Sequence, residues 1–395
     1  MTRPLRIGHQ LSGSIEGDPV AKAVRAEELG FDVVLAADHV GSGWSPLPTL
    51  SAIATTTERI RLGTLVLNND MRNPVQLAWE ASTLDRLSGG RLELGLGAGH
   101  TPQEYEATGI DRAAPIDRKR RLVESVQIIR GLLDGETLDH HGEHYRLVRA
   151  RIDRSEQQRL PILVGGNGET LLNDAGRHAD IVGLQGLGRT REDGYGHEAK
   201  WSTHHLEEQI AQVRAGAGDR FDDIEFNSLV QVVQITADRE AALAEVVERV
   251  DGLTMEDAAS TPYLLIGTVD EIVVHMTTCN ERWGINYFAV RELDSFAPVL
   301  AALRGISRGA GVHLDCGADP GVRCLRWAPP RRDQRCREGA GGGAAMAQNE
   351  PNVQIDRTRG WRFWRWWVPP YRGRRDRLSP DAQGRAANYN MRAGR

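Results

Sequence analysis

Two histidines end apolar runs in the first hundred residues, and both could carry a proton in a reaction. His39 closes the run DVVLAADH, directly after Asp38, and Trp44 follows it as a flat apolar wall. His100 closes the run LELGLGAGH. Because an imidazole gains and loses a proton near neutral pH, His39 is the first candidate for proton transfer and His100 the second. For His39 the alternative, a ring satisfied by local hydrogen bonds, stays open.

Three chain segments could hold a ligand through backbone or apolar surface. They are the apolar pair Leu65 and Val66, the turn of Gly97, Ala98 and Gly99, and the turn of Gly165, Gly166, Asn167 and Gly168. The apolar pair could form the floor under a planar ring. Glycine lets the main chain approach a ligand closely. The last turn leads into an expected helix, whose unpaired N–H groups suit a phosphate, although a plain strand-to-helix turn is the alternative.

Several other classes of site are excluded or disfavoured. The run HHGEHYRL alternates like a hairpin arm, so we expect no metal site there. The chain has no GxSxG elbow and no cysteine placed with a histidine for nucleophilic catalysis. It also lacks an apolar run of membrane-spanning length and a secretory leader, and its four cysteines in 395 residues are too few for a disulfide scaffold. We therefore expect a cytoplasmic protein.

Charge divides the chain into two unlike parts. Residues 306–395 contain 18 Arg, no Lys and 8 acidic residues, a net charge of +10, which leaves −15 for residues 1–305. The acidic part argues against nucleic acid as its partner. The basic part is rich in Gly, Pro and Trp and has no apolar periodicity, so we expect a disordered or non-native extension. The alternative is a nucleic-acid-binding arm, because arginines with interleaved aromatic residues suit phosphates and bases.

Residues 1–305 alternate between strand-like and helix-like segments. Strands are expected at 5–11, 32–39, 61–68, 92–98, 162–165, 181–187, 226–235 and 285–290. Helices are expected at 18–30, 48–59, 74–87, 115–133, 169–178, 203–215, 239–250, 271–283 and 296–303, with an inserted loop at 188–200. Eight such units predict parallel strands, in a closed (β/α)8 barrel or a doubly wound open sheet. Their length favours the barrel, in which chemistry takes place at the C-terminal ends of the strands.

The motifs together resemble the luciferase-like flavin and deazaflavin oxidoreductases, on the branch that uses coenzyme F-420. The similarity covers about residues 5–305 and depends on the segments RIGHQL, ELGFDVVLAADHV, RIRLGTLVLN, DRLSGGRLELGLGAGH, LPILVGGNGETLL, AGRHADIVGL and WGINYFAV. None of them is specific alone.

The resemblance implies a (β/α)8 TIM barrel with an inserted segment and a nonprolyl cis peptide at Leu65-Val66, against which the ring would rest. It places His39, Asp38 and Trp44 beside the deazaflavin. It makes the two glycine turns cofactor-holding segments, with the second near the phosphate. A homodimer is a candidate assembly.

The implied function is hydride transfer between coenzyme F-420 and a small organic substrate. One alternative is an FMN-dependent monooxygenase of the same superfamily, and another is a non-enzymatic binding protein with a nucleic-acid-binding tail. The chain departs from the glucose-6-phosphate-oxidising branch, because His100 stands where that branch has a glutamate. The sugar-phosphate lysine of that branch also has no obvious counterpart among Lys22, Lys119 and Lys200.

Overall fold

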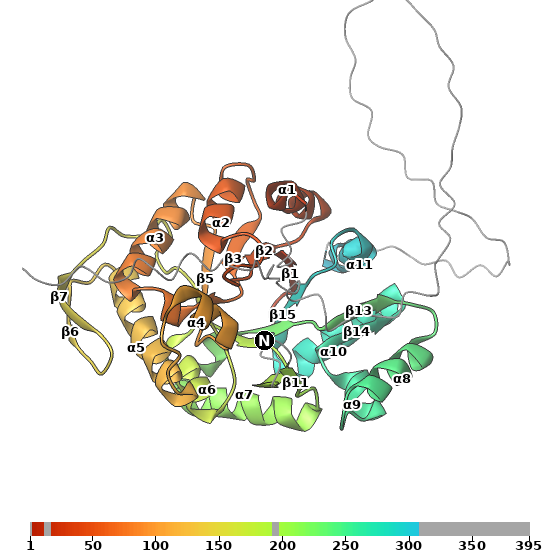
Figure 1. The fold of residues 1–395 in the computed structure, drawn as a ribbon. Coiled ribbons are helices and arrows are strands. Elements are labelled where there is room, and N and C mark those ends of the chain that lie inside the picture. Colours follow the sequence, from red (N-terminus) through yellow and green to blue (C-terminus); the bar gives the residue numbers. More distant parts are fainter. Residues whose placement is uncertain (1, 12–16, 192–196, 308–395) are drawn as a thin grey trace, which may run out of the picture.

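Eight parallel strands close into a barrel in the computed structural model, which describes residues 2–11, 17–191 and 197–307 (Figure 1). The strands are β1 (Arg6–Leu11), β2 (Val33–Ala36), β3 (Arg61–Thr64) with its continuation β4 (Leu67–Asn68), β5 (Leu92–Gly97), β8 (Ile162–Gly165), β9 (Ile181–Leu184), β12 (Glu225–Leu229) and β15 (Ile285–Val290). The sheet order is β3-β2-β1-β15-β12-β9-β8-β5-β4, and the pairing of β3 with β5 closes the ring. The predicted TIM barrel is confirmed.

Helices surround the barrel on its outer side (Figure 1). They are α1 (Pro19–Leu29), α2 (Pro46–Ala54), α3 (Pro74–Leu87), α4 (Pro102–Thr108), α5 (Pro115–Leu133), α6 (Glu169–His178), α7 (Thr203–Ala217), α8 (Arg239–Arg249), α9 (Met255–Ser260), α10 (Val269–Trp283) and α11 (Ala297–Ser307). Local sequence sets their ends. Asp18 caps the first N–H groups of α1, and Gly30 ends that helix in the left-handed conformation at φ +89°.

Two expected strands are each divided in two. The strand expected at 61–68 is interrupted between β3 and β4 by a cis peptide at Leu65-Val66, which confirms the implied position of that bond. The strand expected at 226–235 was wrong as a single barrel strand. Only β12 lies in the barrel, whereas β13 (Val232–Ile235) pairs with β14 (Leu264–Gly267) in a separate two-stranded sheet. The chain leaves the barrel where Gln231 N–H donates to the carbonyl of Tyr263.

Two antiparallel hairpins form separate two-stranded sheets outside the barrel sheet. The segment HHGEHYRL lies in the antiparallel pair β6 (Leu138–His141) and β7 (Arg146–Ala150), as its alternation predicts. The expected inserted loop contains a second antiparallel pair, β10 (Leu187–Thr190) and β11 (His197–Ala199). The short helices α4 and α9 were not predicted from the sequence.

The barrel interior is filled by side chains that point inward from alternate positions of the strands. A central apolar layer includes Leu35, Leu163, Ile181, Leu229 and Tyr287, all at most 4% exposed. A larger apolar layer lies between the strands and the helices. Across the part of the chain that the structure describes, no helix is both long and apolar enough to span a membrane. The basic extension lies outside the described residues from position 308 onward.

Candidate functional site

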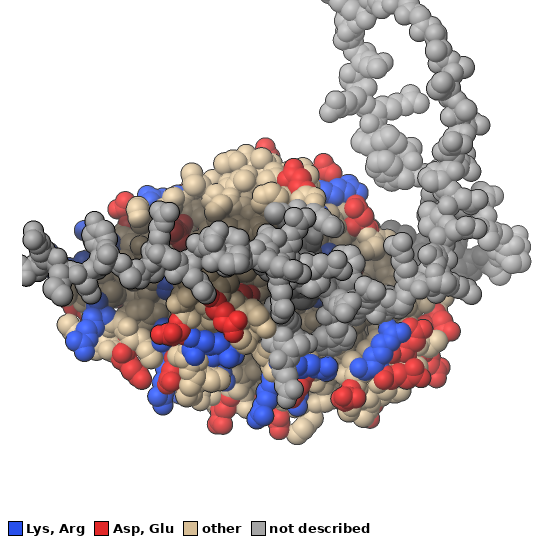
Figure 2. Space-filling model, in the orientation of Figure 1, with Lys and Arg blue, Asp and Glu red and all other residues tan. Residues whose placement is uncertain are grey.

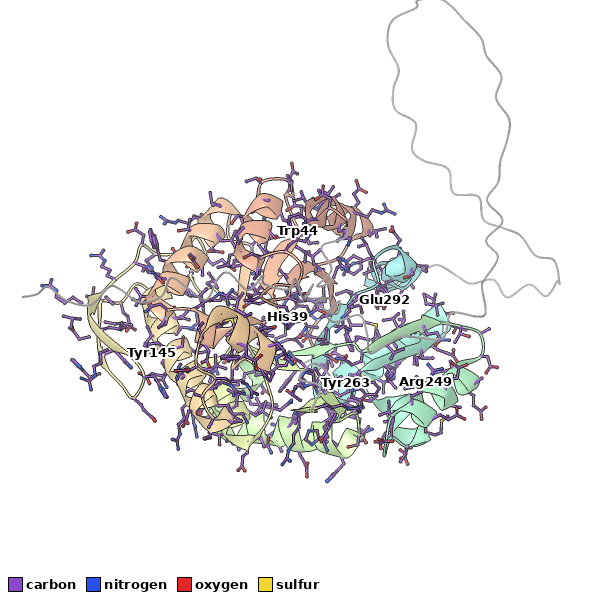
Figure 3. All side chains as sticks on the ribbon, in the orientation of Figure 1. His39, Trp44, Tyr145, Arg249, Tyr263 and Glu292 are labelled. Carbon is purple, nitrogen blue, oxygen red and sulfur yellow. The ribbon has the colours of Figure 1, made fainter. Side chains whose placement is uncertain are left out.

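His39 lies just beyond the C-terminal end of β2, and its ring is held by a carboxylate. His39 Nδ1 is 2.6 Å from Oε1 of Glu104, and the two side chains are only 13% and 8% exposed. Figure 3 shows His39 near the centre of the barrel, as a residue from a strand end should be. Sequence analysis missed Glu104. A weak signal was present, because Thr101-Pro102 followed by an acidic residue is typical of a helix start.

His100 follows the C-terminal end of β5, and its ring lies beside that of His39. The two rings meet edge to face with 5.9 Å between their centroids, and the ring of His197 from the inserted hairpin lies 4.7 Å from that of His100. Burial lowers the pKa of His100 to about 3, and the neighbouring His197 and His39 add to this effect. His100 is therefore a neutral ring at physiological pH, which can contact a ligand but does not store a proton.

Asp38 and Trp44 differ in how they are placed. The Asp38 carboxylate accepts 3.0 Å from Arg72 Nη2 and 2.8 Å from the N–H of Asn68, so it ties the end of β2 to the end of β4. Trp44 is 46% exposed in the loop that follows His39 (Figure 3). Asp38 therefore holds the backbone next to His39 against the end of β4, while Trp44 offers an accessible flat surface.

The glycines after β5 allow unusually close packing at the strand ends. A Cβ on Gly97 would lie 2.6 Å from Val66 Cγ2, so the absence of a side chain leaves room for Val66. A Cβ on Gly99 would lie 2.3 Å from the hydroxyl of Tyr105. The carbonyl of Leu65 accepts 3.2 Å from Gln10 Nε2. The first glycine turn thus positions the apolar pair Leu65 and Val66 and brings α4 close to the barrel.

The second glycine turn precedes α6, as the sequence predicts. Gly168 occupies the N-cap position without a side-chain cap, and a Cβ there would lie 2.7 Å from Lys119 Nζ. Asn167 is used within the protein, because its side chain donates to the carbonyl of Leu187 and accepts 2.9 Å from Gln209. The groups of this turn with the chemistry to attract an anion are the backbone N–H groups at the start of α6 and the nearby Lys119 ammonium.

The histidine-rich hairpin has a structural explanation. His140 Nε2 is 2.8 Å from Glu124 on α5, which attaches the hairpin to that helix. No group of three metal-ligating side chains is arranged around a common point in the described part of the chain.

Known proteins agree with this architecture. Residues 17–276 match the family described as luciferase-like monooxygenase. The chain belongs to this family. An F-420-dependent glucose-6-phosphate dehydrogenase of Amycolatopsis mediterranei (strain U-32) is 34% identical over 186 residues, which are 45% of this chain and 56% of that protein. The chain thus spans about half the length of the curated relatives it matches.

Solved structures share the fold at lower sequence identity. The coenzyme F-420 dependent tetrahydromethanopterin reductase from Methanopyrus kandleri superposes with a TM-score of 0.58 at 20% identity, over 76% of this chain and 97% of that one. A long-chain alkane monooxygenase gives a TM-score of 0.60 at 16% identity, over 78% and 92%. At these identities the likeness concerns the fold alone.

Proposed function

We propose that this chain is an F-420-dependent oxidoreductase that moves a hydride between the deazaflavin and a small organic substrate. The observation that carries the proposal is the pair formed by His39 and Glu104 at the C-terminal end of the barrel, where the imidazole is partly buried and held by a carboxylate. The curated relatives named as F-420-dependent dehydrogenases support the choice of coenzyme.

The strand ends fit a planar ring that carries a phosphate. Leu65 and Val66 supply apolar surface, and the glycine turn after β8 supplies backbone N–H groups beside Lys119. When bound, the coenzyme supplies the carbon that accepts or releases the hydride.

His39 handles the proton that accompanies the hydride. Because a carboxylate only accepts hydrogen bonds, Nδ1 of a neutral His39 carries the hydrogen and the lone pair is on Nε2. Nε2 can therefore take a proton from a substrate hydroxyl, and the imidazolium returns it in the reverse direction. His100 contacts substrate or ring as a neutral group.

The positions of the lysines favour a substrate without a phosphate. Lys119 lies at the second glycine turn, Lys200 pairs with Glu198, and Lys22 lies on α1. Lys119 therefore lies at the turn assigned to the coenzyme phosphate and Lys200 contacts a carboxylate, so neither supports a sugar phosphate beside His39. We propose a small alcohol or carbonyl compound instead.

Direct titration tests the coenzyme assignment. Purified full-length chain is mixed with F-420 and, separately, with FMN, and binding is followed by coenzyme fluorescence. We expect micromolar or tighter binding of F-420 and much weaker binding of FMN. Preferential binding of FMN, with oxygen consumption on reduction, would replace the proposal with a flavin monooxygenase. Binding of neither coenzyme would remove the enzymatic proposal.

A further inference from the structure

The short helix α4 carries two adjacent side chains that are both buried. Glu104 is 7% exposed and Tyr105 is 2% exposed, although the helix is only seven residues long and lies outside the barrel. Glu106, the next residue, is exposed. Burying a carboxylate costs free energy unless it is paired, so this position needs an explanation.

Glu104 makes its short contact with Nδ1 of His39, not with Nε2. The distance of 2.6 Å between Glu104 Oε1 and His39 Nδ1 is that of a charge-assisted hydrogen bond. We propose that Glu104 is a positioning residue that keeps His39 in the Nδ1–H tautomer and aims Nε2 at the substrate. This inference rests on the proposed function and adds to it which residue orients the proton carrier.

Tyr105 anchors the helix that presents Glu104. Its hydroxyl donates 3.1 Å to Oδ2 of Asp70, and Asp70 lies 3.1 Å from Nη1 of Arg121 on α5. Asp70 follows β4 directly, in the short helix η1 (Asn69–Met71). The same anchor therefore joins α4 to the strand end next to the apolar pair and to the outer helix α5.

A second side chain also contacts the His39 ring. His100 meets it edge to face, and the backbone at His39 is held where Ser42 N–H donates 3.0 Å to the carbonyl of His39. With Glu104 on Nδ1 of the ring, the tautomer decides which nitrogen can exchange a proton. In a neutral imidazole only one nitrogen is basic, and the partner of the other nitrogen selects it.

Glu104→Gln separates positioning from folding, with Glu106→Gln as the matched control on the same helix. First, histidine ring nitrogens are labelled with 15N and read at about pH 8, above the ordinary histidine pKa, and His39 is assigned from its loss in His39→Ala. We expect wild type and Glu106→Gln to show the Nδ1–H form of His39. We expect Glu104→Gln to show a mixture of tautomers, because an amide can donate as well as accept.

Kinetics with F-420 form the second readout. Glu104→Gln should lower kcat by about 10- to 100-fold with KM within about threefold, because proton transfer is impaired while binding is not. Glu104→Asp should recover part of kcat, since it restores the carboxylate, and Tyr105→Phe should show a smaller loss than Glu104→Gln.

The two readouts fail in different ways. An unchanged His39 tautomer in Glu104→Gln would overturn the positioning role, whatever the activity. A changed tautomer in a protein that transfers no hydride with F-420 would leave Glu104 in its role and overturn the proposed function. Equal losses of kcat in Glu104→Gln and Glu106→Gln would also overturn the inference.

Discussion

The two ends of the barrel use charge in opposite ways. At the N-terminal ends of the strands, Arg6, Arg61, Glu93 and Glu225 point inward and pair with one another. Arg6 and Arg61 both contact Glu93, and Arg6 Nη1 lies 2.5 Å from Glu225. The Arg6 guanidinium also lies 4.5 Å above the ring of Tyr287. The charges at this end are therefore paired within the protein, although Oε2 of Glu93 is buried without a hydrogen-bond partner.

At the C-terminal ends of the strands the carboxylates orient other groups. Glu104 holds His39, Asp38 holds the β4 end, and His100 remains neutral. The difference shows how one barrel separates stability from chemistry. The ion pairs at the N-terminal ends of the strands stabilise the fold, and the C-terminal ends can present the neutral His100 ring and backbone groups to a ligand.

The largest effect should come from disrupting the ion pairs at the N-terminal ends of the barrel strands. Glu93 is 3% exposed, so Glu93→Ala leaves two guanidinium groups without their main partner. We expect the free energy of unfolding to fall by about 2–4 kcal/mol, measured by urea denaturation. Coenzyme affinity should stay within about threefold of wild type. A comparable loss in the exposed control Glu80→Ala would show that the ion-pair layer is not responsible.

The next largest effect should be on turnover and should come from a substitution at the C-terminal ends of the barrel strands. We expect His39→Ala to lower kcat by about 100-fold, because the proton carrier is removed, while the Kd for the coenzyme changes by less than about threefold. The control is His141→Ala, an exposed histidine on the β6–β7 hairpin. Steady-state kinetics and fluorescence titration give both numbers, and unchanged turnover would exclude His39 from the mechanism.

A smaller effect should appear in how the free energy of unfolding depends on pH. The pKa of His100 is lowered to about 3, so the unfolded chain binds this proton first and the native state loses stability as pH falls below about 6.5. We expect His100→Gln to reduce that loss by about 2 kcal/mol between pH 7 and pH 5. His9, buried beside Phe31 with a pKa lowered to about 4, contributes in the same range, so the slope should flatten without vanishing.

The smallest effect should follow removal of the basic extension. Within the described part of the chain, every residue assigned to the site lies before the end of α11, so we expect a chain ending at Ser307 to bind the coenzyme with an unchanged Kd. The same variant and the full chain are compared for DNA binding at low and high salt. A salt-dependent affinity present only in the full chain would give the extension a separate role in binding nucleic acid.

The eight-stranded barrel could be predicted because each strand is a short apolar run bounded by turn residues. The run at 226–235 was misassigned because no Gly or Pro separates β12 from β13, and periodicity does not reveal that the hydrogen-bonding partner changes at Gln231. His39 could be found from its strand end. Glu104 could not, because its partner lies 65 positions away and the helix around it has no apolar stripe.

Gly99 gives this arrangement an unexpected dependence. With φ at +71° and the Tyr105 hydroxyl where a methyl group would stand, only glycine lets α4 settle against the strand end. A residue with no side chain therefore sets how near the Glu104 carboxylate comes to the imidazole of His39. A Cβ at position 99 would displace α4, and the reaction would be affected through the changed position of Glu104 relative to His39.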